Sequence, residues 1–262
     1  MIQKMSRGDR MKPQLVLLHG WAVNSLIWNS ILDRLESEFD VTLIDLPGYG
    51  TDTDYFEDYS LETVAEVVLS RAPEKANWVA WSLGGTIALS AALAHPERFE
   101  KMQLISATPR FMYGEDWEQG AKLPLFKQMA DDFAKDYPSA LRKFLLLAIL
   151  SRDRAKAMKL TREVRDLTKT MGQHKPPVDR TIQEGLNILR TTDLRDRLGE
   201  LTIETQVIAG DNDHIVDSKS SRYLFDQIPN GHSFHLFETG HMPFLHSPDR
   251  YIEALVDFIK PK

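Results

Sequence analysis

A serine between a strand-like run and a helix-like run constrains this chain most. Residues 78–81 are apolar and rich in β-favouring side chains, whereas residues 84–93 are mostly small or aliphatic. Ser82 lies between the two runs, and Gly84 and Gly85 follow it closely. This spacing predicts a sharp strand-to-helix turn that exposes the serine hydroxyl beside the positive N-terminal end of a helix.

The rest of the first 110 residues alternates between strand and helix patterns. Apolar residues recur at helical spacing over 28–35 and 61–69, with Ser60 as a plausible N-cap. Strands are expected at 15–18, 41–44, 77–81 and 102–105. This order predicts an α/β fold whose mostly parallel, twisted sheet carries helices on both faces.

The alternation stops between about residues 110 and 190, where only helical patterns occur. One apolar stripe joins Leu160, Val164, Leu167 and Met171, and the opposite face carries basic residues. Strand-like runs return at 205–209 and 233–237, and a last helix is expected over 248–259. We therefore expect a core made of residues 1–110 and 190–262, interrupted by a helical lid at 111–189.

Composition excludes several classes of function. The chain has 262 residues, no cysteine and a formal net charge of −6. Thiolate catalysis, thiolate metal sites and disulfides are therefore excluded, and the acidic balance argues against nucleic-acid binding. No apolar run approaches the length of a membrane span, which predicts a cytoplasmic protein with no membrane association.

Candidate partners for Ser82 lie far downstream. A serine hydroxyl needs a base, and the base needs an orienting group. Asp211 and Asp213 follow the strand at 205–209, and His241 lies in the loop before the last helix. The order serine, acid, histidine suits nucleophilic catalysis at the carboxyl ends of parallel strands, with either aspartate as the acid.

Backbone donors for an oxyanion are expected at two places. Trp21 closes the run His19-Gly20-Trp21 at the end of the first strand, and Leu83 directly follows Ser82. The N–H groups of Trp21 and Leu83 are therefore the predicted oxyanion hole. His19 is expected to hold its turn by hydrogen bonding.

These segments resemble the α/β-hydrolases. More narrowly, the chain is similar to the pimeloyl-[acyl-carrier protein] methyl ester esterases of biotin synthesis. The similarity rests on residues 15–21, 45–50, 81–85, 95–98, 184–189 and 192–195, and on the spacing from Asp213 to His241. One position departs from the hydrolase pattern, because Ala80 stands where glycine is usual.

The resemblance implies a mechanism and a partner. Ser82 would be the nucleophile of a serine carboxylesterase, His241 its base, and Asp213 rather than Asp211 the orienting acid. No metal or organic cofactor is implied. The substrate would be a pimeloyl methyl ester attached to acyl carrier protein, a small acidic partner.

A basic block suits such a partner. Residues 142–175 contain ten basic and three acidic side chains in an otherwise acidic chain. A charged helix face that is simply solvated is the alternative. The candidate docking residues are Arg142, Arg152, Arg154, Lys156, Lys159 and Arg162.

Four aromatic residues are candidates for the substrate pocket, although the last three could equally be core residues. They are Trp21, Trp81, Phe111 and Phe144.

Other functions on the same scaffold stay open. A broad short-chain carboxylesterase or a carbon–carbon bond hydrolase would use the same residues with a different pocket. A non-catalytic, ligand-binding α/β-hydrolase receptor is the alternative outside enzymes. Epoxide hydrolases and haloalkane dehalogenases would need an aspartate at position 82, where this chain has serine.

Overall fold

A single parallel sheet organises the protein. The computed structural model describes residues 12–52, 56–150, 154–172, 176–177 and 179–260. The strand order is β2-β1-β3-β4-β5-β6, and every neighbouring pair is parallel, as the alternating sequence pattern predicted. The strands are β1 (Gln14–Leu18), β2 (Asp40–Ile44), β3 (Ala76–Trp81), β4 (Phe99–Ile105), β5 (Glu204–Gly210) and β6 (Gly231–Phe237).

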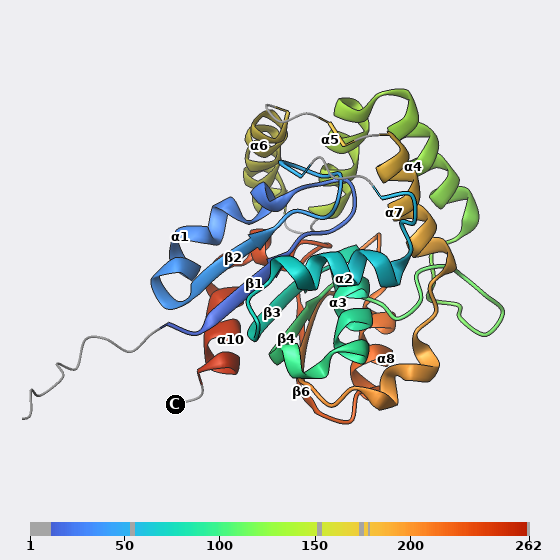
Figure 1. Ribbon diagram of the computed structural model, residues 1–262. Helices are drawn as coiled ribbons and strands as arrows, with labels where there is room; N and C mark the ends of the chain where they lie inside the picture. The colour runs from blue at the N-terminus through green and yellow to red at the C-terminus, as the bar shows by residue number, and fades with distance from the viewer. Residues whose placement is uncertain (1–11, 53–55, 151–153, 173–175, 178, 261–262) are drawn as a thin grey trace, which may run out of the picture.

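Helices cover both faces of the sheet (Figure 1). One face carries α1 (Asn29–Glu38) and α10 (Pro248–Ile259), and the other carries α2 (Leu61–Arg71), α3 (Leu83–Ala94) and α8 (Ser218–Gln227). The Ser60 side chain caps α2 by accepting from the Thr63 N–H, as expected. Short helical turns are η1 (Ser25–Trp28), η2 (Pro96–Arg98), η3 (Arg195–Glu200) and α9 (Pro243–His246).

The sheet reverses its order between β1 and β3. The chain passes from β1 outward to β2 and then crosses back to β3, whose Ala80 pairs with Leu18 of β1. In parallel sheets such a reversal opens a crevice at the carboxyl ends of the two strands. Trp21 follows β1 and Ser82 follows β3, so both lie at this reversal point.

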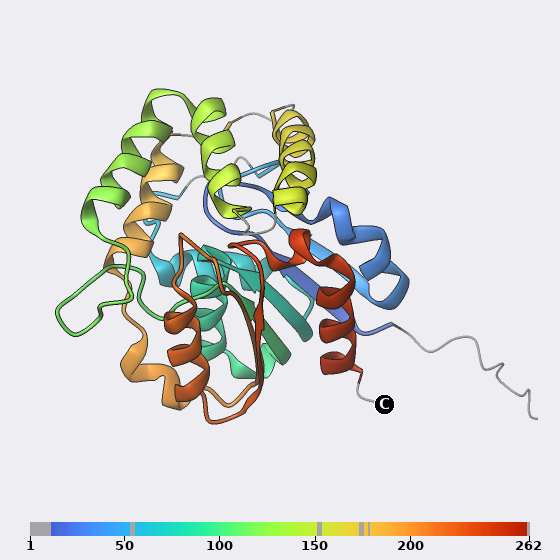
Figure 2. The ribbon, with the colours of Figure 1, turned by 180° about the vertical axis from the view of Figure 1, so that it is seen from behind.

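Four helices form a cap above the carboxyl ends of the strands (Figures 1 and 2). They are α4 (Leu123–Lys135), α5 (Tyr137–Ala148), α6 (Arg154–Met171) and α7 (Asp179–Thr191), called the cap from here on. The predicted stripe on α6 is buried at Leu160, Val164 and Met171. In the described part of residues 106–203, only isolated β-bridges interrupt the helices and loops.

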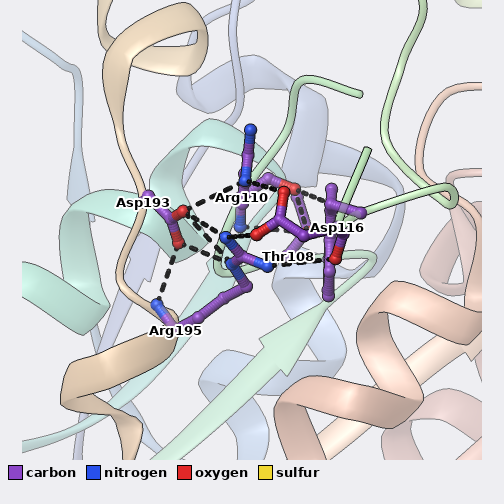
Figure 3. Close-up of polar contacts among 6 residues, drawn as sticks. Thr108, Arg110, Asp116, Asp193 and Arg195 are labelled. Carbon is purple, nitrogen blue, oxygen red and sulfur yellow. Dashed lines mark hydrogen bonds and ion pairs between the residues drawn. The ribbon is translucent and has the colours of Figure 1, made fainter. Parts of the chain in front are cut away.

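The segments that precede α4 and follow α7 meet in a cluster of charged side chains (Figure 3). Arg195 contacts the carboxylates of Asp116 and Asp193, each at 2.7 Å, and Arg110 lies 3.0 and 3.4 Å from the same two groups. Hydrogen bonds from Arg195 lower the pKa values of both aspartates. We call Arg110, Asp116, Asp193 and Arg195 the neck clasp.

The neck clasp also has a backbone component. The Leu194 N–H donates to the Pro109 carbonyl at 2.9 Å, and the Arg195 guanidinium lies 5.3 Å from the centre of the Trp117 ring. Trp117 in turn packs edge-on against Tyr223 of α8. Part of the segment that the sequence assigned to the lid therefore lies against the core.

Membrane crossing has no candidate in the described ranges, because none of their helices combines the length and the apolar character that a span needs.

Candidate active site

Ser82 lies on a tight turn between β3 and α3. Its backbone angles are φ 57° and ψ −121°, and its N–H donates to the Ile105 carbonyl at 3.0 Å. Helix α3 then passes so close to β1 that a Cβ at Gly84 would lie 2.8 Å from the Leu18 carbonyl oxygen. The glycine after the turn is therefore required by this approach, whereas the Ala80 methyl is accommodated within buried β3.

A continuous chain of hydrogen bonds joins Ser82 to two distant residues. His241 Nε2 lies 3.0 Å from Ser82 Oγ, and His241 Nδ1 lies 2.7 Å from Asp213 Oδ2. A carboxylate only accepts, which assigns the ring proton to Nδ1 and leaves Nε2 to accept from the serine hydroxyl. This arrangement can activate a hydroxyl as a nucleophile.

Asp213 is fixed from its other side. Its Oδ1 accepts from the N–H groups of Ile215 and Val216 at 2.8 and 2.9 Å, and its side chain is 1 % exposed. Of the two aspartates that the sequence left open, it is Asp213 whose carboxylate contacts the histidine. The Asp211 N–H instead donates to the Phe237 carbonyl as β6 ends.

The backbone of His241 is held from two directions. Its N–H donates to the Ala148 carbonyl at the end of α5, and its carbonyl accepts from the Trp81 indole N–H, both at 2.8 Å. The sequence suggested Trp81 as a pocket or core residue. In the structure Trp81 is fully buried and supports the histidine loop.

The turn after β1 is held by His19. His19 Nδ1 donates to the Gly20 carbonyl at 2.8 Å, and Nε2 accepts from the Leu46 N–H at 2.9 Å. Burial lowers the pKa of His19, so the ring stays neutral and both nitrogens keep these partners. His19 therefore holds its turn by hydrogen bonding, as the sequence predicted.

Trp21 and Leu83, the predicted backbone donors, follow two neighbouring strands. Leu83 is the first residue of α3, so its N–H has no acceptor within that helix. Trp21 begins the turn after β1, the strand that neighbours β3. Both N–H groups therefore belong to backbone segments beside Ser82.

Aromatic rings of the cap surround the Trp21 side chain. Its ring centre lies 4.5 Å from Phe133 of α4 and 5.7 Å from Phe144 of α5, both edge-on. Phe111 packs against Phe126 at 6.5 Å. Phe111 and Phe144 are 7 % and 6 % exposed, so these candidate pocket residues are largely enclosed by the cap.

Unusual backbone conformations gather beside Ser82. Within the described ranges, the non-glycine residues with positive φ are Ala22 at 63°, Ser82 at 57° and Ser106 at 45°. They follow β1, β3 and β4, which are neighbours in the sheet. Each such conformation costs about 1–3 kcal/mol and persists only where surrounding contacts impose it. Sequence reasoning found only Ser82 of the three, because alanine and serine elsewhere give no signal of a strained backbone.

The candidate docking residues that the structure describes lie on two cap helices. Arg142 is exposed on α5, and Lys156, Lys159 and Arg162 are exposed on α6, where Lys159 lies 3.7 Å from Glu163. Arg152 lies outside the described residues, as does the side chain of Arg154. Among the described side chains, no group of histidines and carboxylates has the arrangement of a metal site.

Comparisons with known proteins identify the family of the chain. The model of the alpha/beta hydrolase fold family matches residues 13–248. The pimeloyl-[acyl-carrier protein] methyl ester esterase of Yersinia enterocolitica is 35% identical over 93% of this chain and 92% of its own. The enzyme of that name from Pectobacterium atrosepticum is 36% identical over 93% of each chain. Among solved structures, an esterase from Exiguobacterium antarcticum has a TM-score of 0.81 and 25% identity, covering 95% of this chain and 92% of that one.

Proposed function

Since the chain belongs to the alpha/beta hydrolase fold family, we propose that it is a serine carboxylesterase that hydrolyses the methyl ester of pimeloyl-[acyl-carrier protein] in biotin synthesis. The hydrogen-bonded chain from Asp213 through His241 to Ser82 carries the catalytic part of the proposal. Two relatives named for this activity support the assignment of the substrate. They are 35% and 36% identical to this chain over nearly their whole length.

The mechanism proceeds through an acyl-enzyme. Ser82 Oγ attacks the ester carbonyl carbon while its proton moves to His241 Nε2. The tetrahedral intermediate then breaks its bond to the methoxy oxygen, which takes the proton from His241 and leaves as methanol. A water molecule attacks the acyl-serine, again giving a proton to His241, and Ser82 Oγ leaves with that proton. The pimeloyl chain is released from the enzyme with a free carboxyl end.

Asp213 and the backbone donors stabilise the charges that develop. Asp213 keeps the His241 proton on Nδ1 and stabilises the imidazolium that forms beside it, 2.7 Å away. The N–H groups of Trp21 and Leu83 donate hydrogen bonds to the negatively charged oxygen of the tetrahedral intermediate. Loss of one such donor typically costs about 10²–10³ in rate.

The exposed basic residues of the cap provide the docking surface for the acidic carrier protein. Each exposed ion pair contributes only about 0.2–1 kcal/mol, but several together raise the encounter rate and set the orientation. The triple charge reversal Arg142→Glu, Lys159→Glu, Arg162→Glu should lower kcat/KM for the carrier-bound ester at low salt. Hydrolysis of a p-nitrophenyl ester should be unchanged.

A matched variant tests whether the position of these charges matters. Lys75, Arg197 and Lys219 are exposed on the core, and their reversal to glutamate makes the same change in net charge. Equal losses in the two triple variants, or none in the cap variant, would contradict docking on α5 and α6.

Growth without biotin tests the assigned substrate. A bacterial strain that lacks its own pimeloyl-carrier methyl esterase should grow when it carries the wild-type chain and fail with Ser82→Ala. Failure of the wild-type chain, together with good turnover of p-nitrophenyl esters, would instead favour a broad esterase. Absence of turnover with tight binding of a small molecule would favour a receptor.

A further inference from the structure

Three successive residues after β1 are each held by a different hydrogen bond. The Gly20 carbonyl accepts from His19 Nδ1 at 2.8 Å, within the core. The Trp21 indole N–H donates to the Ile182 carbonyl of α7 at 2.9 Å, and the Ala22 carbonyl accepts from the Tyr137 hydroxyl of α5 at 3.0 Å. Two of the three partners therefore belong to the cap.

Ala22 needs such support more than its neighbours do. It is fully buried and has a φ of 63°, which an L residue with a side chain rarely adopts. A strained conformation persists only when its surroundings impose it. The Tyr137 hydroxyl is the cap group that bonds this residue directly.

Tyr137 is itself well placed to act as a fixed donor. It is the first residue of α5, and the Asp136 side chain caps that helix by accepting from the Ser139 N–H. Its ring packs edge-on against Phe133 at 5.7 Å. Burial raises the pKa of the Tyr137 phenol, so the hydroxyl keeps its proton and remains a donor.

We propose that Tyr137 is a positioning residue, whose hydroxyl holds the Ala22 carbonyl and thereby fixes the Trp21 N–H where it stabilises the oxyanion. The proposal rests on the proposed function, in which Trp21 supplies that donor. It makes the cap a working part of the oxyanion hole, because a helix of the cap sets the backbone of a core loop. A misplaced donor loses strength in the transition state while substrate binding is unaffected.

The variant Tyr137→Phe removes the hydroxyl and keeps the ring. With p-nitrophenyl acetate, kcat should fall about tenfold and KM should stay within about twofold, because only a transition-state interaction is weakened. A trifluoromethyl ketone forms a hemiketal oxyanion on a catalytic serine, and its inhibition constant should rise by the same factor as kcat/KM falls. A purely structural role would lower the melting temperature and the active fraction without this matched change.

Tyr59→Phe is the matched control. The Tyr59 hydroxyl also donates to a backbone carbonyl, that of Pro47 at 2.8 Å, and its removal should leave kcat and ketone inhibition unchanged. If the wild type turns over and Tyr137→Phe matches it in kcat and ketone inhibition, the role of Tyr137 is refuted while the proposed function stands. If the wild type itself shows no turnover that depends on Ser82, the proposed function fails, and the positioning role fails with it.

Discussion

The cap joins the core through two regions of opposite chemistry. The first, which we call the α5 seam, consists of neutral hydrogen bonds between the two ends of α5 and the loops around Ser82. At the start of α5, the Tyr137 hydroxyl donates to the Ala22 carbonyl. At the other end, the Ala148 carbonyl accepts from the His241 N–H, the Ile149 carbonyl from His246 Nε2 and the Leu150 carbonyl from Asn212 Nδ2. The second is the neck clasp, which is built from arginine and aspartate side chains.

The two regions differ in what they can fix. The neck clasp joins partly exposed charges, and solvent screens such pairs and lets their side chains rearrange. The core groups of the α5 seam include the fully buried His241, and all the acceptors of the seam are backbone carbonyls, at Ala22 and at the end of α5. We therefore expect the seam to set the geometry around Ser82 and the clasp only to hold the ends of the cap together.

The largest effect is expected from Gly240→Ala in the α5 seam. A Cβ at this position would lie 2.5 Å from the Ala148 carbonyl oxygen and 2.9 Å from that of Leu150. Backbone atoms cannot move aside cheaply, so His241 should be displaced from Ser82. A displacement of about 1 Å can cost about 10²-fold in rate. We expect a loss of that order in kcat for p-nitrophenyl acetate.

Gly199→Ala provides the control for that substitution. A Cβ at Gly199 meets no atom within 4 Å, so activity and melting temperature should match the wild type. If Gly240→Ala retained full activity, the seam would not set the position of the histidine.

An effect of intermediate size on the free energy of unfolding is expected when the pH is lowered. It comes from His246 in the α5 seam and from His19 in the loop after β1, which the seam contacts. Burial lowers the pKa of His246; the hydrogen bond to the Ile149 carbonyl opposes this shift and Lys156 adds to it. Burial also lowers the pKa of His19, and the Asp45 carboxylate opposes that shift. The unfolded chain takes up protons at these histidines near pH 6.5, and the folded chain does so only at lower pH. The free energy of unfolding should therefore fall as the pH drops below about 6.5.

Urea unfolding at pH 7.5 and 5.5 measures this loss. In His246→Gln the difference between the two values should shrink, since one titrating group is removed. In Arg195→Gln the difference in the free energy of unfolding between the two pH values should equal that of the wild type. Lowered aspartate pKa values give stability that is present above pH of about 3.9 and is lost only as the pH falls through the folded pKa. An unchanged difference in His246→Gln would refute the pH sensitivity of the seam.

The smallest effect is expected from the neck clasp itself. Arg195→Gln removes the guanidinium between Asp116 and Asp193 and should lower the free energy of unfolding only slightly, and less at high salt. The rate constant kcat for p-nitrophenyl acetate should stay within about twofold. A tenfold fall in kcat at unchanged stability would show that the clasp also sets catalytic geometry, and the contrast between the two regions would collapse.

The sequence predicted the strands, the turn at Ser82 and the residues that lie together beside it, because these leave marks in side-chain type. Apolar runs mark buried strands, and Ser82, Asp213 and His241 are chemically distinctive. The α5 seam leaves almost no such mark. Its acceptors are carbonyls, which every residue has, and they come from Ala22, Ala148, Ile149 and Leu150.

The neck clasp illustrates a different limit. In the sequence, residues 192–195 contribute only to the family resemblance and carry no sign of a role of their own. Asp193 and Arg195 act together with Arg110 and Asp116, which lie far away in the chain. Charged residues at a surface pair in many ways, so spacing in the sequence alone could not select this one.

Hydrolysis of the purified carrier-bound methyl ester tests the central claim most directly. Mass spectrometry would follow loss of the methyl group from pimeloyl-[acyl-carrier protein] with wild-type protein and with Ser82→Ala, both shown to be folded. We predict complete conversion by the wild type, with release of methanol, and conversion by Ser82→Ala at least about 10³-fold slower. Conversion by Ser82→Ala at the wild-type rate would contradict the account.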